Sequence, residues 1–273
     1  VGSEMCIRDR PKGLRNKIAP APRKVAAPGR PTHRRMLVLD GCVQPALAPH
    51  INQAAARVLA RLGIALQTVN PGVCCGALPH HLSDPQKARA MARANIDAWL
   101  PHLQQGAEAI VITASGCAAQ VRDYPHILAD DPAYRDKARQ VAALARDLVE
   151  VLGAEDLQRL PLSASAGRTA VHTPCTLQHA LGLNGAVERL LQGLGYQLTE
   201  VAEGHLCCGS AGTYSLTQPG ISARLRDRKL AALTRDHPQR IVTANIGCLG
   251  QLQDDDGVPV LHWIDLLDQD LRD

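Results

Sequence analysis

The sequence predicts an α/β protein with two pseudo-symmetric Rossmann-like halves, in which helices flank parallel sheets. Three observations support this fold class. Short apolar runs alternate with amphipathic helical patterns beyond residue 35. The order of these elements occurs twice along the chain. Cysteines follow the ends of the predicted strands in both copies, and the carboxyl ends of parallel strands meet at the ligand-binding edge of such a sheet.

The first copy alternates strictly between strand and helix. Gly63 ends one predicted helix and the Asp84-Pro85 pair begins the next. The predicted elements are a strand at 36–40, a helix at 49–62, a strand at 64–69, a helix at 84–100 and a strand at 109–113.

The second copy repeats this order after a connection whose pattern predicts one amphipathic helix over 133–152. Its predicted elements are a strand at 169–172, a helix at 185–194, a strand at 196–201, a helix at 219–235, a strand at 240–244, a strand at 258–261 and a closing helix at 263–271.

The chain divides into four predicted segments. Residues 1–10 resemble a non-native extension and are set aside together with Cys6. Residues 11–34 form a linker rich in Pro and Arg. The first cysteine-rich repeat then covers 35–155 and the second covers 165–273.

Charge and hydropathy exclude several classes of function. The formal net charge of +4 divides into +8 for residues 1–35 and −4 for the rest of the chain. An acidic folded part with 2% aromatic residues does not favour nucleic-acid binding. No apolar run is long enough for a transmembrane segment, and no secretory signal is visible. The expected location is the cytoplasm, where thiols stay reduced. Peripheral attachment to the inner membrane is compatible with this expectation.

Eight of the nine cysteines form one pattern that is written twice. Each copy has a single cysteine, a Cys-Cys-Gly triplet whose first cysteine lies 32 residues further on, and another single cysteine. The members are Cys42, Cys74, Cys75 and Cys117 in the first copy, and Cys175, Cys207, Cys208 and Cys248 in the second. Thiols repeated at fixed places in a reduced compartment indicate metal or cluster ligands.

Adjacent cysteines limit the alternatives. Neighbouring Cα atoms lie about 3.8 Å apart, which is below the usual disulfide range. Two buried structural thiols would explain one pair but not two pairs in matched frames. Single zinc ions prefer Cys-x₂-Cys spacing, whereas adjacent thiolates can each reach a different iron of a cluster. Gly76 and Gly209 fit a positive φ or a close approach of the backbone.

Several phrases around these cysteines resemble a known family. They are LDGCVQP (39–45), CCGALPHHL (74–82), ASGCAAQVRDYPHIL (114–128), HTPCTLQH (172–179), LCCGSAGTYSLTQP (206–219) and TANIGC (243–248). The pattern is similar to the duplicated cysteine-rich (CCG) domain, which occurs in heterodisulfide reductase and in lactate-utilisation proteins. The phrases are most similar to the iron–sulfur subunit of glycolate oxidase (glycolate dehydrogenase).

The resemblance implies an electron-transfer subunit of an oxidoreductase complex. Flavin-containing glycolate oxidase subunits would oxidise glycolate, and electrons would pass through this chain toward a quinone, its indirect partner. The chain would not bind glycolate itself, so no catalytic residue is expected. The resemblance implies an iron–sulfur cluster of the [4Fe-4S] type in at least one half, with zinc possible in one or both.

Two departures from the family pattern qualify this expectation. The family's N-terminal ferredoxin-like cysteine runs are absent, which predicts a C-terminal fragment of a longer subunit. The fullest CCG pattern ends in Cys-x₂-Cys, but Gln120 and Gln251 stand where the fifth thiols would be. Four thiols per half suffice for a four-iron cluster or for zinc, and disulfide-cleaving chemistry becomes less favoured.

Histidines and alternative functions stay open at this point. His81 lies in a matching family phrase and is the best supporting candidate, while His172, His179 and His205 are each a ligand, a proton relay or a loop residue. One alternative function is a structural zinc module that assembles the same complex. Another is a thiol-active redox subunit similar to heterodisulfide reductase or to lactate-utilisation proteins.

Overall fold

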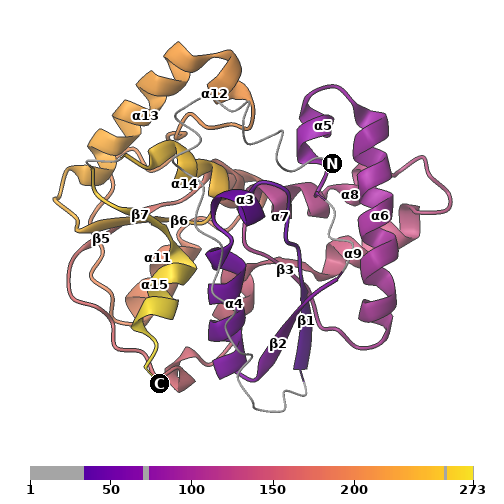
Figure 1. Ribbon diagram of the computed structural model, residues 1–273, viewed down its shortest axis with the longest axis horizontal. Helices are drawn as coiled ribbons and strands as arrows, with labels where there is room; N and C mark the ends of the chain where they lie inside the picture. The colour runs from indigo at the N-terminus through magenta and orange to yellow at the C-terminus, as the bar shows by residue number, and fades with distance from the viewer. Residues whose placement is uncertain (1–33, 70–73, 255–256, 273) are drawn as a thin grey trace.

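The computed structural model describes residues 34–69, 74–254 and 257–272 (Figure 1). Its strands form two parallel sheets, one of order β2-β1-β3-β4 and one of order β5-β6-β7. Helices pack on both faces of each sheet, so the predicted α/β class with parallel sheets flanked by helices is confirmed. The predicted extension at 1–10 and all of the predicted linker except Arg34 lie outside the described residues.

The first half begins with β1 and ends with α10. Its strands are β1 (Arg34–Val38), β2 (Ile64–Thr68), β3 (Ile110–Ile112) and β4 (Ala145–Asp147). Its helices are α3 (Gln44–Leu47), α4 (His50–Arg61), α5 (Ala77–His81), α6 (Pro85–Gln104), α7 (Ser115–Arg122), α8 (Tyr124–Ile127), α9 (Arg135–Leu144) and α10 (Leu148–Gly153).

A 3₁₀ turn, η1 (Leu157–Arg159), leads into the second half. The strands of this half are β5 (Thr169–His172), β6 (Arg240–Thr243) and β7 (Val260–His262). Its helical elements are a π-helical turn η2 (Thr176–Ala180), α11 (Ala186–Gly193), α12 (Tyr214–Thr217), α13 (Pro219–Thr234), α14 (Ile246–Leu252) and α15 (Trp263–Asp270).

The two sheets correspond strand by strand. In the first, β1 pairs with β2 and β3, and β3 pairs with β4. In the second, β5 pairs with β6 and β6 pairs with β7. Leu198 adds one parallel bridge beside Thr169, at the edge that β2 occupies in the first half. The strands β1, β3 and β4 therefore match β5, β6 and β7.

Two elements differ from the sequence prediction. The single helix predicted at 133–152 is wrong, because β4 interrupts it and pairs with β3. Asp147 and Glu150 form a capping box at the start of α10, and this Asp-x-x-Glu motif was a visible signal for the break. The strand predicted at 196–201 is reduced to the single bridge at Leu198, where only Gln197 and Thr199 exchange backbone hydrogen bonds with Thr169.

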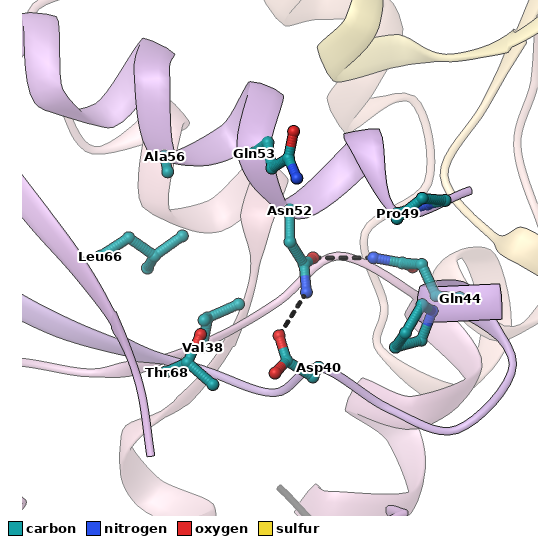
Figure 2. A pocket seen from close by; sticks show the side chains of 10 residues that line it. Val38, Asp40, Gln44, Pro49, Asn52, Gln53, Ala56, Leu66 and Thr68 are labelled. Atoms are coloured by element: carbon teal, nitrogen blue, oxygen red, sulfur yellow. Dashed lines mark hydrogen bonds between the residues drawn. The ribbon is translucent and has the colours of Figure 1, made fainter. Parts of the chain in front are cut away.

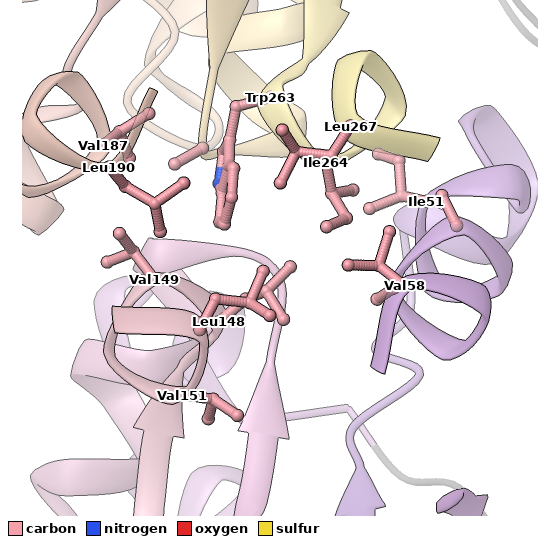
Figure 3. Close-up of a cluster of buried hydrophobic side chains, with 14 of the residues drawn as sticks. Ile51, Val58, Leu148, Val149, Val151, Val187, Leu190, Trp263, Ile264 and Leu267 are labelled. Atoms are coloured by element: carbon pink, nitrogen blue, oxygen red, sulfur yellow. The ribbon is translucent and has the colours of Figure 1, made fainter. Parts of the chain in front are cut away.

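One hydrophobic core joins the halves (Figure 3). Side chains alternate along each strand, so Met36 and Val111 face this shared core while Leu37 and Ile110 face the opposite side of the sheet. The helices α4, α10, α11 and α15 supply most of the remaining contacts. Their apolar side chains drawn in Figure 3 include Ile51, Val58, Leu148, Val149, Val187, Leu190, Trp263, Ile264 and Leu267.

One helix of each half packs against a helix of the other half. The C-terminal helix α15 of the second half packs on α4 of the first, and α10 of the first half packs on α11 of the second. Trp263 and Leu148, the first residues of α15 and α10, are completely buried. Because each such side chain contributes about 1.5–3 kcal/mol when removed from water, the halves stabilise one another.

Candidate metal centre

The four cysteines of the first repeat meet beyond the carboxyl ends of β1, β2 and β3, and are named here the first cysteine site. They are Cys42, Cys74, Cys75 and Cys117. The Sγ atoms of Cys42 and Cys74 lie 3.2 Å apart, and those of Cys75 and Cys117 lie 3.4 Å apart. All four are free thiols, so these contacts are not disulfides.

The four cysteines of the second repeat form the matching second cysteine site. They are Cys175, Cys207, Cys208 and Cys248. The Sγ atoms of Cys208 and Cys248 lie 3.2 Å apart. Cys175 interacts with Cys207, and the backbone N–H of Gly209 donates to the Sγ of Cys207 over 3.3 Å. Segments separated by more than 70 residues thus converge, as expected for cysteines that follow the carboxyl ends of parallel strands.

Local structure places each thiol in an equivalent way in both halves. Cys42 and Cys175 lie in the short loops between the ends of β1 and β5 and the next helical elements, α3 and η2. Cys117 and Cys248 each occupy the third residue of a helix, α7 and α14. The positive end of a helix dipole lies at such a position and favours the thiolate, which is the form that binds metals.

Burial increases from the outer to the inner thiols of each site. Cys42 and Cys175 are exposed, whereas Cys75 and Cys208 are only 3% and 2% exposed. A centre held by these groups would therefore have one side toward solvent and one side in the protein.

In each site the outer thiol and the first thiol of the Cys-Cys pair form a hydrogen-bonded pair, and this contact shifts the pKa values of both. The pKa of Cys74 is lowered to about 2, chiefly by its hydrogen-bond contact with the thiol of Cys42, and the pKa of Cys42 is raised in turn. Cys207 and Cys175 repeat this relation, with the pKa of Cys207 lowered to about 2. Each site thus readily carries at least one thiolate.

Both predicted glycines are used as expected. Gly76 and Gly209 have φ values of +86° and +88°, which residues with a Cβ rarely adopt. A Cβ on Gly76 would lie 3.3 Å from the carbonyl oxygen of Ala88, and one on Gly209 would lie 2.5 Å from that of Ser222. Each glycine lets its Cys-Cys loop pack directly on the following long helix, α6 or α13.

Gln120 and Gln251 each form hydrogen bonds to other elements of their own half. Gln120 is buried, and its amide lies 3.3 Å from the Nδ1 of His80. Gln251 donates to the Oγ of Ser222 over 2.9 Å, and this hydroxyl donates to the carbonyl oxygen of Gly209 over 2.9 Å. The amides therefore tie α7 to α5, the helix that follows the first Cys-Cys-Gly triplet, and tie α14 through Ser222 to the second triplet.

The structure distributes the candidate histidines differently from the sequence reasoning. His81 is exposed and stacks on His80, so His80 is the neighbour that reaches Gln120. His179 and His205 are exposed as well. His172 is 1% exposed, at the end of β5, and one of its ring nitrogens lies with the sulfurs of Cys208 and Cys248 in a group whose atoms are all within 4.8 Å of one another.

Sequence reasoning missed the polar groups behind the thiols. In the first half, Asn95 donates to the carbonyl oxygen of Cys74 over 3.0 Å and to the hydroxyl of Tyr124 over 2.8 Å. That hydroxyl donates to the carbonyl oxygen of Cys75 over 2.9 Å. In the second half, the Nζ of the completely buried Lys229 donates to the carbonyl oxygen of Gly204 over 3.0 Å. Asn95 and Lys229 lie inside the helices predicted at 84–100 and 219–235, and no local motif marks either residue in the sequence.

Pockets lie next to the outer cysteine of each site. The first, of about 330 Å³, is bordered by Asp40 and Gln44, two residues on either side of Cys42 (Figure 2). Asn52 joins them, accepting from Gln44 over 2.7 Å and donating to Asp40 over 3.1 Å. A pocket of about 280 Å³ in the second half includes Thr173, two residues before Cys175. The duplication thus extends to the surroundings of the thiols.

The donor set fits a thiophilic metal or an iron–sulfur cluster. Each site offers four free thiols within a small space, and the outer and inner ones approach it from different loops. Soft thiolates are the ligands that iron–sulfur clusters and zinc prefer. The residues therefore fit the group that the sequence pattern implied.

Comparison with known proteins agrees with this geometry. The sequence profile of the cysteine-rich domain (CCG) matches residues 36–122 and again residues 169–253. The chain is 50% identical over 264 residues to the glycolate oxidase iron-sulfur subunit of Escherichia coli (strain K12), covering 96% of this chain. It spans 64% of the length of that relative. The resemblance stated from the sequence is confirmed.

Two further matches, one in sequence and one in fold, are less similar. The lactate utilization protein A of Bacillus subtilis (strain 168) is 28% identical over 236 residues, which cover 83% of this chain and 95% of that protein. The crystal structure of a hypothetical protein from Helicobacter pylori has the same fold, with a TM-score of 0.64 at 9% identity over 95% of this chain and 53% of the other. The chain belongs to the family of proteins that carry the cysteine-rich CCG domain, and it carries that domain twice.

Proposed function

We propose that this chain is the C-terminal part of an iron–sulfur electron-transfer subunit in a glycolate-oxidising complex. The observation that supports this most strongly is the convergence of four free thiols at the carboxyl edge of each sheet. The identity of 50% with the glycolate oxidase iron-sulfur subunit of Escherichia coli supports the choice of complex.

The proposed ligands are the eight cysteines of the two sites, with Gly76, Gly209, Gln120 and Gln251 as supporting residues that hold the Cys-Cys-Gly loops. A [4Fe-4S] cluster, when bound, supplies one-electron transfer. The inner thiols keep water from one side of each site, and the exposed Cys42 and Cys175 leave the other side open to a partner.

The two sites are neighbours across the contact between the halves. Ser115, two residues before Cys117, shares a hydrogen bond of 2.7 Å with Thr176, the residue after Cys175. Asn245, near Cys248, also donates to the hydroxyl of Ser115 over 3.2 Å. This arrangement supports a relay through both sites.

The exposed apolar side chains support docking of partner subunits at the cysteine face. Large hydrophobic residues with more than 40% exposure lie within, or directly beside, the helices that follow the cysteines, α3, α5, α12 and α13. They are Val43, Leu78, Leu82, Leu216 and Ile221. We infer that flavin-containing subunits approach here and that a quinone receives electrons indirectly. No helix in the described ranges has the length and hydropathy of a membrane span.

The test is anaerobic purification followed by iron, sulfide and zinc analysis and by electron paramagnetic resonance (EPR). Iron and sulfide in about equal amounts, with a redox-active EPR signal, are expected. Metal-free protein with a native fold and eight titratable thiols would contradict the proposal. Zinc alone in both sites would instead support the structural assembly module.

Substrate and direction of electron flow need a second experiment. The complex reconstituted with its flavin subunits should bleach the visible absorbance of the chain when glycolate is added. Lactate serves as the parallel substrate, because lactate utilization protein A is also a relative. Turnover of a disulfide substrate by the isolated chain would favour the thiol-active alternative instead.

A further inference from the structure

The two cysteine sites differ at one buried position that faces the thiols. His172 lies three residues before Cys175, and Leu39 lies three residues before Cys42. Both side chains are buried at the carboxyl ends of the matching strands β5 and β1, with exposures of 1% and 4%. Leu39 belongs to the apolar cluster that includes Cys75. The second half therefore has an imidazole where the first half has a hydrocarbon.

His172 has no well-formed hydrogen bond at either ring nitrogen within the described part of the chain. A buried polar atom without a partner costs about 1–3 kcal/mol, so such an atom requires an explanation. Its neighbours give one, because a ring nitrogen and the sulfurs of Cys208 and Cys248 lie within 4.8 Å of one another. Ligands of one tetrahedral ion are separated by about 3.5–4 Å at ordinary Zn–S and Zn–N bond lengths.

We propose that His172 is a nitrogen ligand of the metal centre in the second cysteine site. The second site then offers a mixed donor set of thiolates and imidazole, while the first site offers thiolates alone. This inference rests on the proposed metal-binding function of the cysteines. The shared chemistry is a transition-metal ion of intermediate softness, either zinc or one iron of a cluster, and both accept imidazole together with thiolate.

Alternatives for His172 are weaker. Its position at the end of β5 puts the ring at the sheet edge where the cysteines converge, and not in the core between the halves. The nearby exposed histidines His179 and His205 have no such set of neighbours among the groups described. They provide matched controls, because they are also close in sequence to cysteines of this site.

The first test detects the nitrogen directly and needs no change at His172. The first site is removed by the double substitution Cys75→Ser and Cys117→Ser, and the chain is labelled with [¹⁵N]histidine. It is loaded either with iron and sulfide or with Co²⁺ as a spectroscopic substitute for zinc, and studied by pulsed EPR. A strong coupling to a directly bound ¹⁵N nucleus is expected in the form that takes up metal.

The second test compares His172→Leu, which copies the first half, with His179→Leu. His172→Leu should lose the ¹⁵N coupling and weaken metal retention against a chelator at least about tenfold. Loss of a mere hydrogen-bond partner of a metal ligand already lowers metal affinity by about that factor. His179→Leu should retain both. Zinc and iron analysis of the purified chain distinguishes the two metals.

The outcomes separate the inference from the proposed function. A second site that binds metal without ¹⁵N coupling, in the chain that retains His172, would overturn the role of His172 and leave the cysteine ligands intact. A chain that takes up no metal at either site would overturn the proposed function. The direct spectroscopic test stays decisive even if His172→Leu fails to fold.

Discussion

The two cysteine sites have the same backbone plan but different groups behind the thiols. Their outer cysteines are exposed, their inner ones are buried, and both Cys-Cys loops turn at a glycine. Behind the first site lie Leu39 and Asn95, whereas His172 and Lys229 lie behind the second. The duplication therefore preserved the scaffold, and it left the second site with a buried histidine and a buried lysine that the first one lacks.

The correspondence of Asn95 and Lys229 follows from the helices themselves. Asn95 lies seven residues after Ala88, which contacts Gly76, and Lys229 lies seven residues after Ser222, which contacts Gly209. Burial lowers the pKa of Lys229, while the nearby thiols of the second site favour its charged form. Two sites with the same cysteine pattern would thus differ in their affinity for a metal, and a cluster bound in each would differ in reduction potential.

The largest expected effect tests whether the two sites are independent. Cys75→Ser and Cys208→Ser should each remove the metal of their own site, so that total metal per chain falls to about half of the wild-type value. Elemental analysis after anaerobic reconstitution measures this. Cys6→Ser, which changes the one cysteine that belongs to neither copy of the repeated pattern, is the control. Simultaneous loss of all metal from either variant would show that the sites form one coupled unit.

The glycine turns should differ in how strongly they resist substitution. Gly209→Ala combines a positive φ with a Cβ that would lie 2.5 Å from a carbonyl oxygen, and should cost about 4 kcal/mol of unfolding free energy. Gly76→Ala has a more open contact of 3.3 Å and should cost about 1–2 kcal/mol. Urea unfolding of the metal-free chain measures both.

Gly153→Ala is the matched control, because it has no positive φ and its Cβ would have no neighbour within 4 Å. It should change the unfolding free energy little. Equal losses at Gly76 and Gly209 would contradict the view that the second loop packs more tightly.

The caps of the matching helices α10 and α15 should respond to pH in opposite directions. Burial raises the pKa of the cap Asp147 to about 7 and lowers that of the cap His262 to about 4. The folded state therefore holds a proton on Asp147 that the unfolded state has released above about pH 4, and this stabilisation is lost as the pH rises toward 7. The neutral His262 gives stability above about pH 6.5 that is lost as the pH falls toward 4.

The single variants separate these two contributions. In Asp147→Asn only the titration of His262 remains of the pair. The unfolding free energy of this variant should therefore rise by about 3 kcal/mol as the pH increases from 4 to 6.5. In His262→Asn it should fall over the same interval. Denaturant unfolding at several pH values measures both slopes. Parallel slopes in the two variants would show that these caps do not control the response.

The smallest expected effect concerns charge behind the second site. Lys229→Asn gives this position the residue found in the first half, and it should shift the reduction potential of the second site to more negative values. The reason is that a nearby positive charge stabilises the reduced form. Redox titration followed by EPR measures the shift, with the exposed Lys87→Asn as control. An unchanged potential would mean that the ammonium is screened from the site.

Much of the candidate site could be predicted because its signals are local. The repeated Cys-Cys-Gly triplets mark both the thiols and the positive-φ turns, because a glycine after two adjacent cysteines allows a backbone conformation that other residues rarely adopt. The interruption of the helix at β4 was harder to predict. Pairing with β3 and the burial of Ala145 outweigh the helical pattern there.

The histidines show where local signals fail. His81 and His172 both lie near cysteines in the sequence, but only the fold exposes the first and buries the second among sulfurs. Lys229 reads as an ordinary residue on a basic helix until packing brings it beneath the loop at Gly204. Burial and contacts between distant segments are collective properties, so spacing alone does not specify them.

The sequence by itself determined the fold class, the duplication and the eight thiols, because periodicity and residue chemistry are written along the chain. Only the tertiary structure decided that α10 and α15 each pack on a helix of the other half within one core, and that His172 and Lys229 are buried near the second site. The physical reason is that helix packing and desolvation depend on which faces meet. That choice is made by the whole folded chain and not by any single segment.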